Sequence, residues 1–389
     1  MAEVMASGVL SQFIGAWGED FGGGPRVRSL ERAWAERFEV RHAISMNSAT
    51  SALYAAVAAA GVGPGDEVIV SPYTMTASAV CALVNGAIPV FADIEPDTFC
   101  LDPASVRACI TPRTKAIVAV DIFGLPADFE ALMATAREHD LVVIEDAAQA
   151  PGAVRGGRYA GTLGHIGVYS LNYHKTIQCG EGGVAVTDDE RLAERLALAR
   201  NHGEAVVADM GSSAADVLGF NYRLGELEAA IAEVQLGRLD ALTQPRIANA
   251  ERLSAGLADL EGVTPPHVPD GVRHAYYLHV VRLDEQALGI SRAAFAAALQ
   301  AEGVPVTEGY VAPLYRQPLY RERSAAAFGD PRNAGSGSYE DGTSPTCERM
   351  HEREVLFHPL IHAGLNDRDI DDIVAAFRKV HARRAELTR

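Results

Sequence analysis

The sequence predicts an α/β protein with a large, mainly parallel sheet and a second, smaller α/β domain. Between residues 43 and 187, short β-branched runs alternate regularly with helical periodicity, which is typical of parallel strands joined by crossover helices. Further along the chain, Pro245 is expected to interrupt a long helical region. We therefore predict a large domain over residues 1–245, which includes an N-terminal arm, and a small domain over residues 246–389.

The N-terminal arm leads through a glycine-rich loop into a first helix. The segment Gly18–Arg28 contains three consecutive glycines and Pro25, which favour a loop. Ser29 is suited to cap a helix that follows. The apolar positions of this helix recur at i, i+4 and i+8, at Leu30, Trp34 and Phe38. We expect the helix to begin directly after Ser29.

Strands and helices then alternate up to residue 140. A strand at Ala43–Ile44 is followed by an alanine-rich helix that begins near Ala49, with Ser48 as its cap. The next expected elements are a strand at 67–70, a helix within 71–87, a strand at 89–94, a strand at 116–123 and a helix at 127–139. No G-x-G-x-x-G follows the first strand, so the fingerprint of a dinucleotide site is missing.

Residues 141–187 organise the rest of the chain. The apolar run Val142–Ile144 predicts a buried strand that ends at Asp146, and a second short strand ends at Ser170, before Lys175. In open α/β sheets, ligands bind at the carboxyl ends of the strands. We therefore expect one crevice to be shared by four side chains, those of Asp146, Gln149, Ser170 and Lys175.

These residue types suit pyridoxal 5′-phosphate. Its aldehyde needs an amine, its ring nitrogen an anion and its phosphate hydrogen-bond donors, and Lys175, Asp146 and Ser170 meet these needs. A helix N-terminus also offers unpaired N–H groups and the positive end of a dipole. We therefore place the phosphate on the first turn of the helix after Ser48, at Ala49, Thr50 and Ser51. Taken singly, the lysine is better interpreted as a solvated loop residue and the aspartate as a helix cap.

The C-terminal half predicts further helices, a few strands and one long loop. An apolar stripe at Leu224, Leu227, Ile231 and Val234 indicates a buried helix face. The other expected elements are helices at 187–200, after Ser291 and at 367–384, and strands within 274–283. Segment 321–345 is rich in glycine, serine, alanine and charge, so we expect a long mobile loop and a possible role as a lid.

The composition of the chain indicates which binding partners and which cellular compartment to expect. The formal net charge of −17 opposes binding to a nucleic acid backbone. The five cysteines form no C-x-x-C pair and show no metal-ligand spacing, which is typical of reduced thiols in a cytoplasmic protein. The N-terminus lacks a basic region before its short apolar stretch, and no run of 18 apolar residues exists, so no signal peptide or membrane span is expected. His358 and His362 are interpreted as structural, and no metal site is expected.

The motifs of residues 145–183 resemble the DegT/DnrJ/StrS family of pyridoxal-phosphate-dependent sugar aminotransferases. The shared pattern is E-D-A-A-Q at a strand end, a serine, a lysine five residues later and then G-E-G-G. The resemblance implies the aspartate-aminotransferase fold, fold type I, with Lys175 as the Schiff-base lysine and Asp146 as the partner of the ring nitrogen. Gln149 is then placed to contact the ring oxygen O3′ or to position the cofactor. Met75 stands where relatives usually carry an aromatic residue, and its thioether can also pack on a π-face.

A further resemblance, at the segment F-N-Y-R-L-G-E-L over residues 220–227, concerns assembly. Relatives use the asparagine of this motif to reach the phosphate in the neighbouring subunit. The resemblance therefore implies a homodimer with shared active sites, in which Asn221 of one chain serves the cofactor of the other.

The reaction that the resemblance implies is transamination. An amino donor, glutamate or glutamine, displaces Lys175, which then moves the proton from the donor's α-carbon while the cofactor becomes pyridoxamine 5′-phosphate. The expected acceptor is a nucleotide-linked keto-sugar in amino-sugar biosynthesis; a cyclitol ketone or a keto sugar acid, in antibiotic or surface-polysaccharide pathways, is the alternative. Sugar 3-dehydratases that resemble this family carry histidine in place of Lys175, which argues against dehydration. The intact set of Asp146, Ser170 and Lys175 argues against a non-catalytic regulatory protein.

Overall fold

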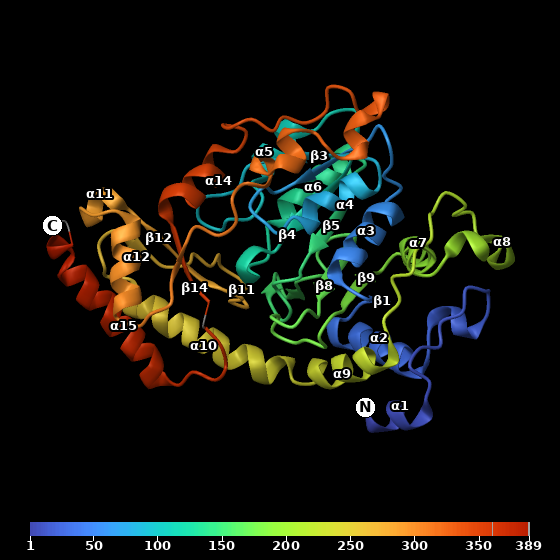
Figure 1. Ribbon diagram of the computed structural model, residues 1–389, viewed down its shortest axis with the longest axis horizontal. Helices are drawn as coiled ribbons and strands as arrows, with labels where there is room; N and C mark the ends of the chain where they lie inside the picture. The colour runs from blue at the N-terminus through green and yellow to red at the C-terminus, as the bar shows by residue number, and fades with distance from the viewer. Residues whose placement is uncertain (360, 388–389) are drawn as a thin grey trace.

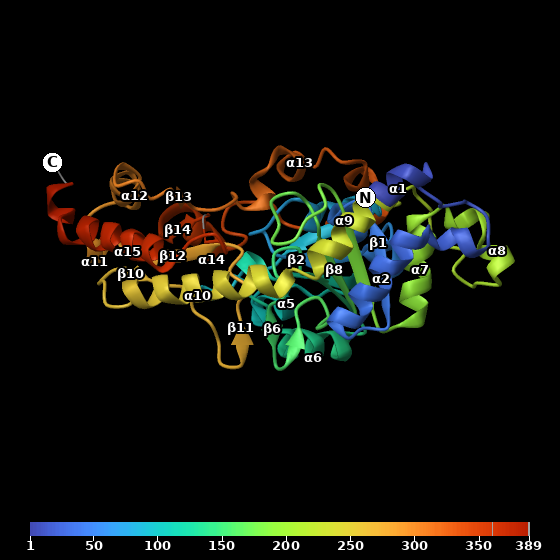
Figure 2. The same ribbon diagram turned by 90° about the horizontal axis from the view of Figure 1, so that it is seen from below.

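The computed structural model describes residues 1–359 and 361–387. Figures 1 and 2 show two units side by side, one built on a large central sheet and one on a smaller sheet near the C-terminus. Helix α10 (Leu239–Leu257) runs along the bottom of Figure 1 from the first unit to the second. Among the described residues, no helix is both long and apolar enough to cross a membrane.

The large sheet has seven strands among the described residues, in the order β1-β9-β8-β5-β4-β2-β3. Strand β9 runs antiparallel to its two neighbours, and the other adjacent pairs are parallel. The predicted mainly parallel sheet is therefore confirmed. Its strands are β1 (His42–Met46), β2 (Glu67–Val70), β3 (Ile88–Phe91), β4 (Thr114–Val120), β5 (Val142–Asp146), β8 (Ile166–Ser170) and β9 (Gly183–Thr187).

Both faces of the large sheet are buried. Along β4, Ala116 and Val118 belong to the apolar core on one face, whereas Ile117 and Ala119 belong to the core on the other. Burial on both faces explains why these strands are continuous apolar runs in the sequence. The helices of this unit are α2 (Pro25–Phe38), α3 (Ala49–Ala59), α4 (Ala77–Val84), α5 (Pro103–Cys109), α6 (Phe129–His139), α7 (Glu190–Arg200) and α9 (Glu226–Leu236).

The second unit is an antiparallel sheet with its own core. The strand order is β10-β12-β14-β13, and the strands are β10 (Val263–Thr264), β12 (His279–Leu283), β13 (Thr307–Glu308) and β14 (Val355–His358). Leu253 of α10, Phe295 of α12 (Arg292–Ala301) and Phe377 of α15 (Asp367–Ala382) pack in this core. Ser291 caps α12, as expected.

Shorter elements connect the two units and their edges. A small sheet pairs β11 (Val272–Arg273) with β6 (Val154–Arg155), which also pairs with β7 (Arg158–Tyr159), so the two units share strands at the bottom of Figure 2. The short helices are α1 (Ala2–Ser7), α8 (Val207–Met210), α11 (Glu285–Leu288), α13 (Pro318–Arg321) and α14 (Pro345–Arg349).

Helix α2 begins at Pro25, so Ser29, the predicted cap, lies inside the helix. Pro25 occupies the first helical position, where its fixed φ suits the helix and its missing N–H removes no bond. The next two amides, of Arg26 and Val27, donate to the carboxylate of Glu226 at 2.9 and 3.2 Å. The predicted loop over the end of Gly18–Arg28 is therefore wrong, because a distant carboxylate caps the helix.

The predicted interruption at Pro245 is also wrong. Pro245 lies inside α10, and the break between α9 and α10 falls at Gly237–Arg238. A proline inside a helix costs about 3 kcal/mol. Burial of Ile247 and Leu253 further along the same helix offsets this cost. The division into two domains at residue 245 stays a prediction.

The predicted helix face of α9 is wrong at its end. Val234 is 66% exposed, and the buried face of the helix is made by Ala229, Ala232 and Leu236. The small side chains on this face permit the helix to lie close to its neighbours.

Other boundaries shift by a few residues: β4 ends at Val120, η2 covers Ile122–Gly124, α6 begins at Phe129, α7 begins at Glu190 and α15 ends at Ala382.

Segment 321–345 is a packed segment, whereas the sequence suggested a mobile lid. The side chain of Asn333 accepts from the Gly65 amide at 2.8 Å and donates to the Gly86 and Ala327 carbonyls at 2.8 and 2.7 Å. Tyr339 donates its hydroxyl to the Pro89 carbonyl at 2.8 Å. These bonds hold the segment beside β3, at the top of Figure 1, and its residues do not line the cavity at the carboxyl ends of the strands.

Candidate active site

A cavity of about 230 Å³ lies at the carboxyl ends of the parallel strands. Met46 at the end of β1 and Ser170 at the end of β8 both pair with Gly183, so the two strand ends meet at one edge. The structure brings seven of the predicted residues to this cavity: Ala49, Thr50, Met75, Asp146, Gln149, Ser170 and Lys175.

The N-terminus of α3 forms one wall of the cavity. The side chain of Ser48 accepts from the Ser51 amide at 3.0 Å, and the first helical bond runs from the Ala52 amide to the Ser48 carbonyl at 3.1 Å. The amides of Ala49 and Thr50 therefore precede the helical ladder, where the positive dipole end favours an anion. Gly183 permits this close approach of β9, because a Cβ there would lie 2.4 Å from the Ala49 nitrogen.

Asp146 ends β5 with a carboxylate that two groups hold in place. Ser78 on α4 donates its hydroxyl to Oδ2 at 2.7 Å, and the Ala148 amide donates to Oδ1 at 3.2 Å. Burial raises the pKa of Asp146, and these hydrogen bonds act in the opposite direction. The carboxyl is thus oriented by neutral donors, and a cationic partner in the cavity would favour its ionised form.

Lys175 presents its amine to the same cavity. Its Nζ lies 4.6 Å from the centre of the Tyr277 ring, and no hydrogen bond or ion pair holds it within the described residues. Burial lowers the pKa of Lys175 to about 8, although the charge of Asp146 acts to raise it. With this pKa, part of the amine is neutral near physiological pH, which is the state that a nucleophile needs.

Gln149 is fixed by both ends of its amide. Its Oε1 accepts from the Phe123 amide at 2.7 Å, and its Nε2 donates to the Tyr310 hydroxyl at 3.1 Å. Phe123 adopts a positive φ of 59° in the turn after β4, which aims its N–H at this glutamine. Tyr310 follows β13 of the small sheet, so the second unit helps to position a residue of the cavity.

The sequence matches the DegT/DnrJ/EryC1/StrS aminotransferase family over residues 17–378. The chain belongs to this family. The predicted family and the fold type I architecture are thereby confirmed, and aminotransferases of this family use pyridoxal phosphate.

Three relatives show how broad the family is. The aminotransferase is 38% identical over 377 residues to the L-glutamine:2-deoxy-scyllo-inosose aminotransferase of Streptomyces kanamyceticus, covering 93% of this chain and 87% of the relative. It is 37% identical over 355 residues to the GDP-perosamine synthase of Caulobacter vibrioides, covering 91% and 90%. It superposes on the crystal structure of S. venezuelae DesV in complex with a ketimine intermediate with a TM-score of 0.82, at 33% identity, covering 98% and 93%.

Two predicted residues of the aminotransferase do not line the cavity. Ser51 belongs to the cap of α3: its amide is taken by Ser48, and its hydroxyl donates to the Asn47 side chain at 2.6 Å. Asn221 lies outside the cavity and is exposed; its carbonyl accepts from the Asn47 side chain at 3.5 Å. The roles assigned to both residues stay predictions.

Several cavity residues of the aminotransferase were missed by sequence reasoning. Asn172 and His174 flank the lysine, and Asn172 donates its side-chain amide to Glu181 of the G-E-G-G motif at 2.7 Å. Their place within the lysine motif was a usable signal. Ser78 and Tyr310 gave no such signal, because their partners Asp146 and Gln149 are 68 and 161 positions away in the sequence.

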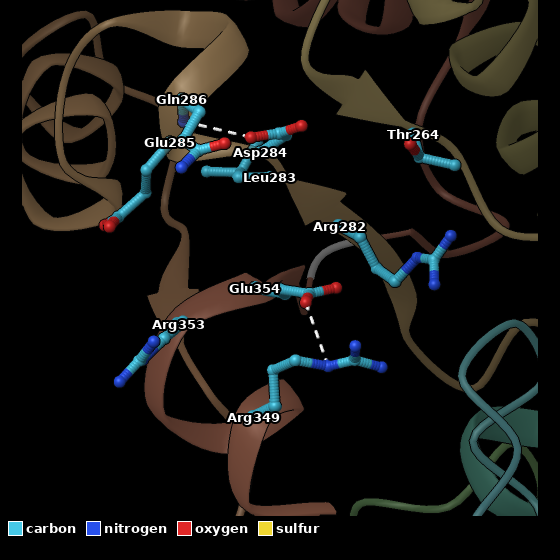
Figure 3. A pocket seen from close by; sticks show the side chains of 9 residues that line it. All are labelled: Thr264, Arg282, Leu283, Asp284, Glu285, Gln286, Arg349, Arg353 and Glu354. Atoms are coloured by element: carbon cyan, nitrogen blue, oxygen red, sulfur yellow. Dashed lines mark hydrogen bonds and ion pairs between the residues drawn. The ribbon is translucent and has the colours of Figure 1, made fainter. Parts of the chain in front are cut away.

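A second hollow, of about 530 Å³, lies on the small sheet of the aminotransferase. Figure 3 shows arginines and acidic residues around it, with Arg349 paired to Glu354 at 3.1 Å and Arg353 pointing away from that pair. Arg282 at its edge pairs with Asp97 at 3.0 Å. Three of the charged groups around this hollow, Arg282, Arg349 and Glu354, are thus paired with other protein groups.

Proposed function

We propose that this aminotransferase binds pyridoxal phosphate in the cavity at the carboxyl ends of the strands and transfers an amino group from glutamate or glutamine to a sugar ketone. The observation that carries the proposal is the amine of Lys175, which is half-buried without an ion-pair partner in the same cavity as the buried carboxylate of Asp146. An amine in this state is costly unless a ligand uses it. In a non-catalytic protein with the same fold, the Lys175 amine and the Asp146 carboxylate in one cavity would have no function that offsets this cost.

The residues of the cavity fit the demands of this cofactor. When bound, pyridoxal phosphate supplies an aldehyde that accepts the amino group and a ring that delocalises negative charge. Asp146 would hold the proton on the ring nitrogen, and the amides of Ala49 and Thr50 with the Ser170 hydroxyl would hold the phosphate. Lys175 would hold the aldehyde carbon through Nζ, and its free amine would carry the proton of the donor's α-carbon. Met75 and Gln149 would lie against the ring.

The acceptor that we propose first is a nucleotide-linked keto-sugar, in amino-sugar biosynthesis. The similarity to a GDP-perosamine synthase supports it. A cyclitol ketone is the second candidate, because a relative that covers most of the chain is named as a glutamine:2-deoxy-scyllo-inosose aminotransferase. We test the choice by incubating the purified enzyme with glutamate or glutamine and a panel of keto-sugars, nucleotide-linked keto-sugars and inososes, and by detecting the aminated product by mass spectrometry. Amination of none of them would contradict the proposed acceptor class.

We propose in addition a cytoplasmic homodimer with shared sites. The free state of all five cysteines supports a reducing compartment. At the cavity, Met75 is 60% exposed, and Tyr173 nearby on the lysine loop is 73% exposed, which suits burial by a second copy. Asn221 of that copy then completes the phosphate site.

Mixed dimers test whether the sites are shared. Coexpression of a Lys175→Ala chain with an Asn221→Ala chain should give heterodimers that recover part of the activity, because one of the two sites then contains both intact residues. Homodimers of each variant are the controls and should be inactive. Purified heterodimers without any activity would place both residues in the same half of the site.

A further inference from the structure

Three carboxyl groups lie at the ends of two neighbouring strands behind the cavity. Asp146 and Glu145 end β5, and Asp121 directly follows β4, with the Asp121 amide donating to the Asp146 carbonyl at 3.1 Å. Asp146 faces the cavity and serves the proposed function. Asp121 and Glu145 do not line it, and both are fully buried. Neither residue takes part in the proposed chemistry of the cavity.

Glu145 is surrounded by donors that suit an ionised carboxylate. Oε1 accepts from the Gly161 amide at 2.5 Å, and Oε2 accepts from the Leu163 and Gly164 amides at 2.7 and 2.9 Å. The glycines make this wrapping possible: Gly161 adopts a φ of +90°, and a Cβ on Gly164 would lie 3.0 Å from the Val143 carbonyl. Burial raises the pKa of Glu145, and these three backbone donors act in the opposite direction because they stabilise its negative charge.

Asp121 has the opposite environment. Its Oδ1 accepts from the Ala127 amide at 3.0 Å, but its Oδ2 is buried and meets no donor within the described part of the chain. Asp121 and Glu145 lie at the adjoining ends of β4 and β5 and interact with each other in the protein interior. Two carboxylates cannot bond to each other unless one of them carries a proton. Burial and the neighbouring Glu145 charge raise the pKa of Asp121 well above its usual range, so the geometry and the electrostatics agree.

We propose that Asp121 is held as a neutral acid that donates its proton from Oδ2 to the carboxylate of Glu145, so that the pair carries a single negative charge behind Asp146. The other titratable groups that act on the pair are Asp146 on β5, Tyr169 on β8 and Cys100. Tyr169 donates its hydroxyl to the Ala160 carbonyl at 2.6 Å, so it does not supply the missing donor.

The trapped proton matters for the cavity because a third buried negative charge would oppose ionisation of Asp146. Asp121 is therefore a positioning residue: it keeps Asp146 available as a carboxylate without touching the cofactor or the substrate. This consequence rests on the proposed function, whereas the protonation of Asp121 does not. The two can therefore fail separately.

Infrared spectroscopy of the purified holoenzyme tests the protonation directly. At pH 8 the wild type should show the carbonyl stretch of a protonated carboxyl group. The band should be lost in Asp121→Asn, whose amide can donate to Glu145 in the same way, and retained in Asp140→Asn, the matched change at an exposed aspartate. A wild type without the band, or an Asp121→Asn spectrum that loses only carboxylate absorption, would overturn the proposal; the first result needs no folded variant.

Stability against pH gives a second measurement. The folded pKa of Asp121 is raised above its unfolded value, so its contribution to stability is full in acid and is lost as the pH rises towards the folded pKa. Asparagine does not titrate, so the Tm of Asp121→Asn relative to the wild type should rise as the pH increases from 5 towards the folded pKa of Asp121. A difference in Tm that is independent of pH would contradict the trapped proton.

The absorbance of the bound cofactor reports the consequence for Asp146. Because asparagine is neutral like the proposed acid, Asp121→Asn should keep the midpoint of the pH titration of the cofactor absorbance. A shifted midpoint would mean that the wild-type residue is charged. Absence of bound cofactor in the wild type would contradict the proposed function instead, and the infrared result would still decide the protonation.

Discussion

The cavity at the carboxyl ends of the large sheet and the hollow on the small sheet are both lined by charged residues. The two sites differ in how far these residues are buried and in whether they are paired. In the first, Asp146 is buried, Lys175 is half-buried and the amine has no ion-pair partner. In the second, Arg349 and Glu354 pair at 3.1 Å with half of the arginine side chain in solvent. Buried, incompletely partnered charges cost stability and are available to a ligand, whereas exposed pairs contribute little. The difference teaches that partnering and burial distinguish a reactive site better than the size of a hollow.

The largest effect is expected at the lysine. Lys175→Ala removes the only amine of the cavity among the described residues, so turnover should fall by roughly 1,000-fold or more. The visible absorbance of the bound cofactor should disappear as well, which absorbance spectroscopy of the purified protein measures. Arg353→Ala in the second hollow is the matched control and should leave both unchanged. Normal transamination by the lysine variant would break the comparison.

The aspartate should give the next largest effect. Asp146→Asn keeps the shape of the side chain and an acceptor for the Ser78 hydroxyl, so the protein should fold with nearly unchanged Tm. A neutral amide cannot hold the proton on the ring nitrogen, so kcat should fall by about 100-fold or more. Steady-state kinetics and thermal unfolding separate the two outcomes. If kcat of the variant equals that of the wild type, another acid holds the proton on the ring nitrogen.

Buried histidines in and next to the small sheet sharpen the contrast, because there burial disfavours the charged form of the side chain. Burial lowers the pKa of His274 and His279 to about 3 and of His358 to about 4. Unfolding restores ordinary values, so this contribution to stability is full above pH 6.5 and is lost as the pH falls towards 4. Between pH 6.5 and pH 5 we expect a loss on the order of 2 kcal/mol per histidine.

Thermal or denaturant unfolding at several pH values measures this loss. His274 accepts from the Tyr276 amide through Nδ1 at 2.9 Å, which requires an unprotonated nitrogen. His274→Gln should therefore flatten the acid side of the profile, whereas His267→Gln, at an exposed position, should not. Identical profiles for the wild type and both variants would mean that the buried histidines do not control acid stability.

The smallest effect is expected at the surface pair of the second hollow. Arg349→Ala, Glu354→Ala and the double variant form a cycle whose coupling energy should be about 0 to 1 kcal/mol, because half of the arginine side chain is in solvent. Denaturant unfolding at low and high salt measures it, and the value should shrink with salt. A coupling of several kcal/mol would show that the two regions are less different than their exposure suggests.

The sequence by itself determined those features that depend on neighbours within a few residues. The apolar run before Asp146, the Ser48 cap of α3 and the spacing from Ser170 to Lys175 follow from strand period, capping chemistry and local turns, and they were predicted. They were enough for the fold class, the family and most of the cavity, because parallel strands present their carboxyl ends to one edge.

The tertiary structure decided what depends on partners that are distant along the chain. The Glu226 carboxylate, 200 positions from Arg26, moved the start of α2 to Pro25. Ser78 orients Asp146, and Tyr310 orients Gln149, across 68 and 161 positions. Packing of α10 against the small core outweighed the helix-breaking tendency of Pro245. Local propensities are worth about 1 kcal/mol per residue, so burial and long-range hydrogen bonds of comparable or larger size override them wherever the fold brings such partners together.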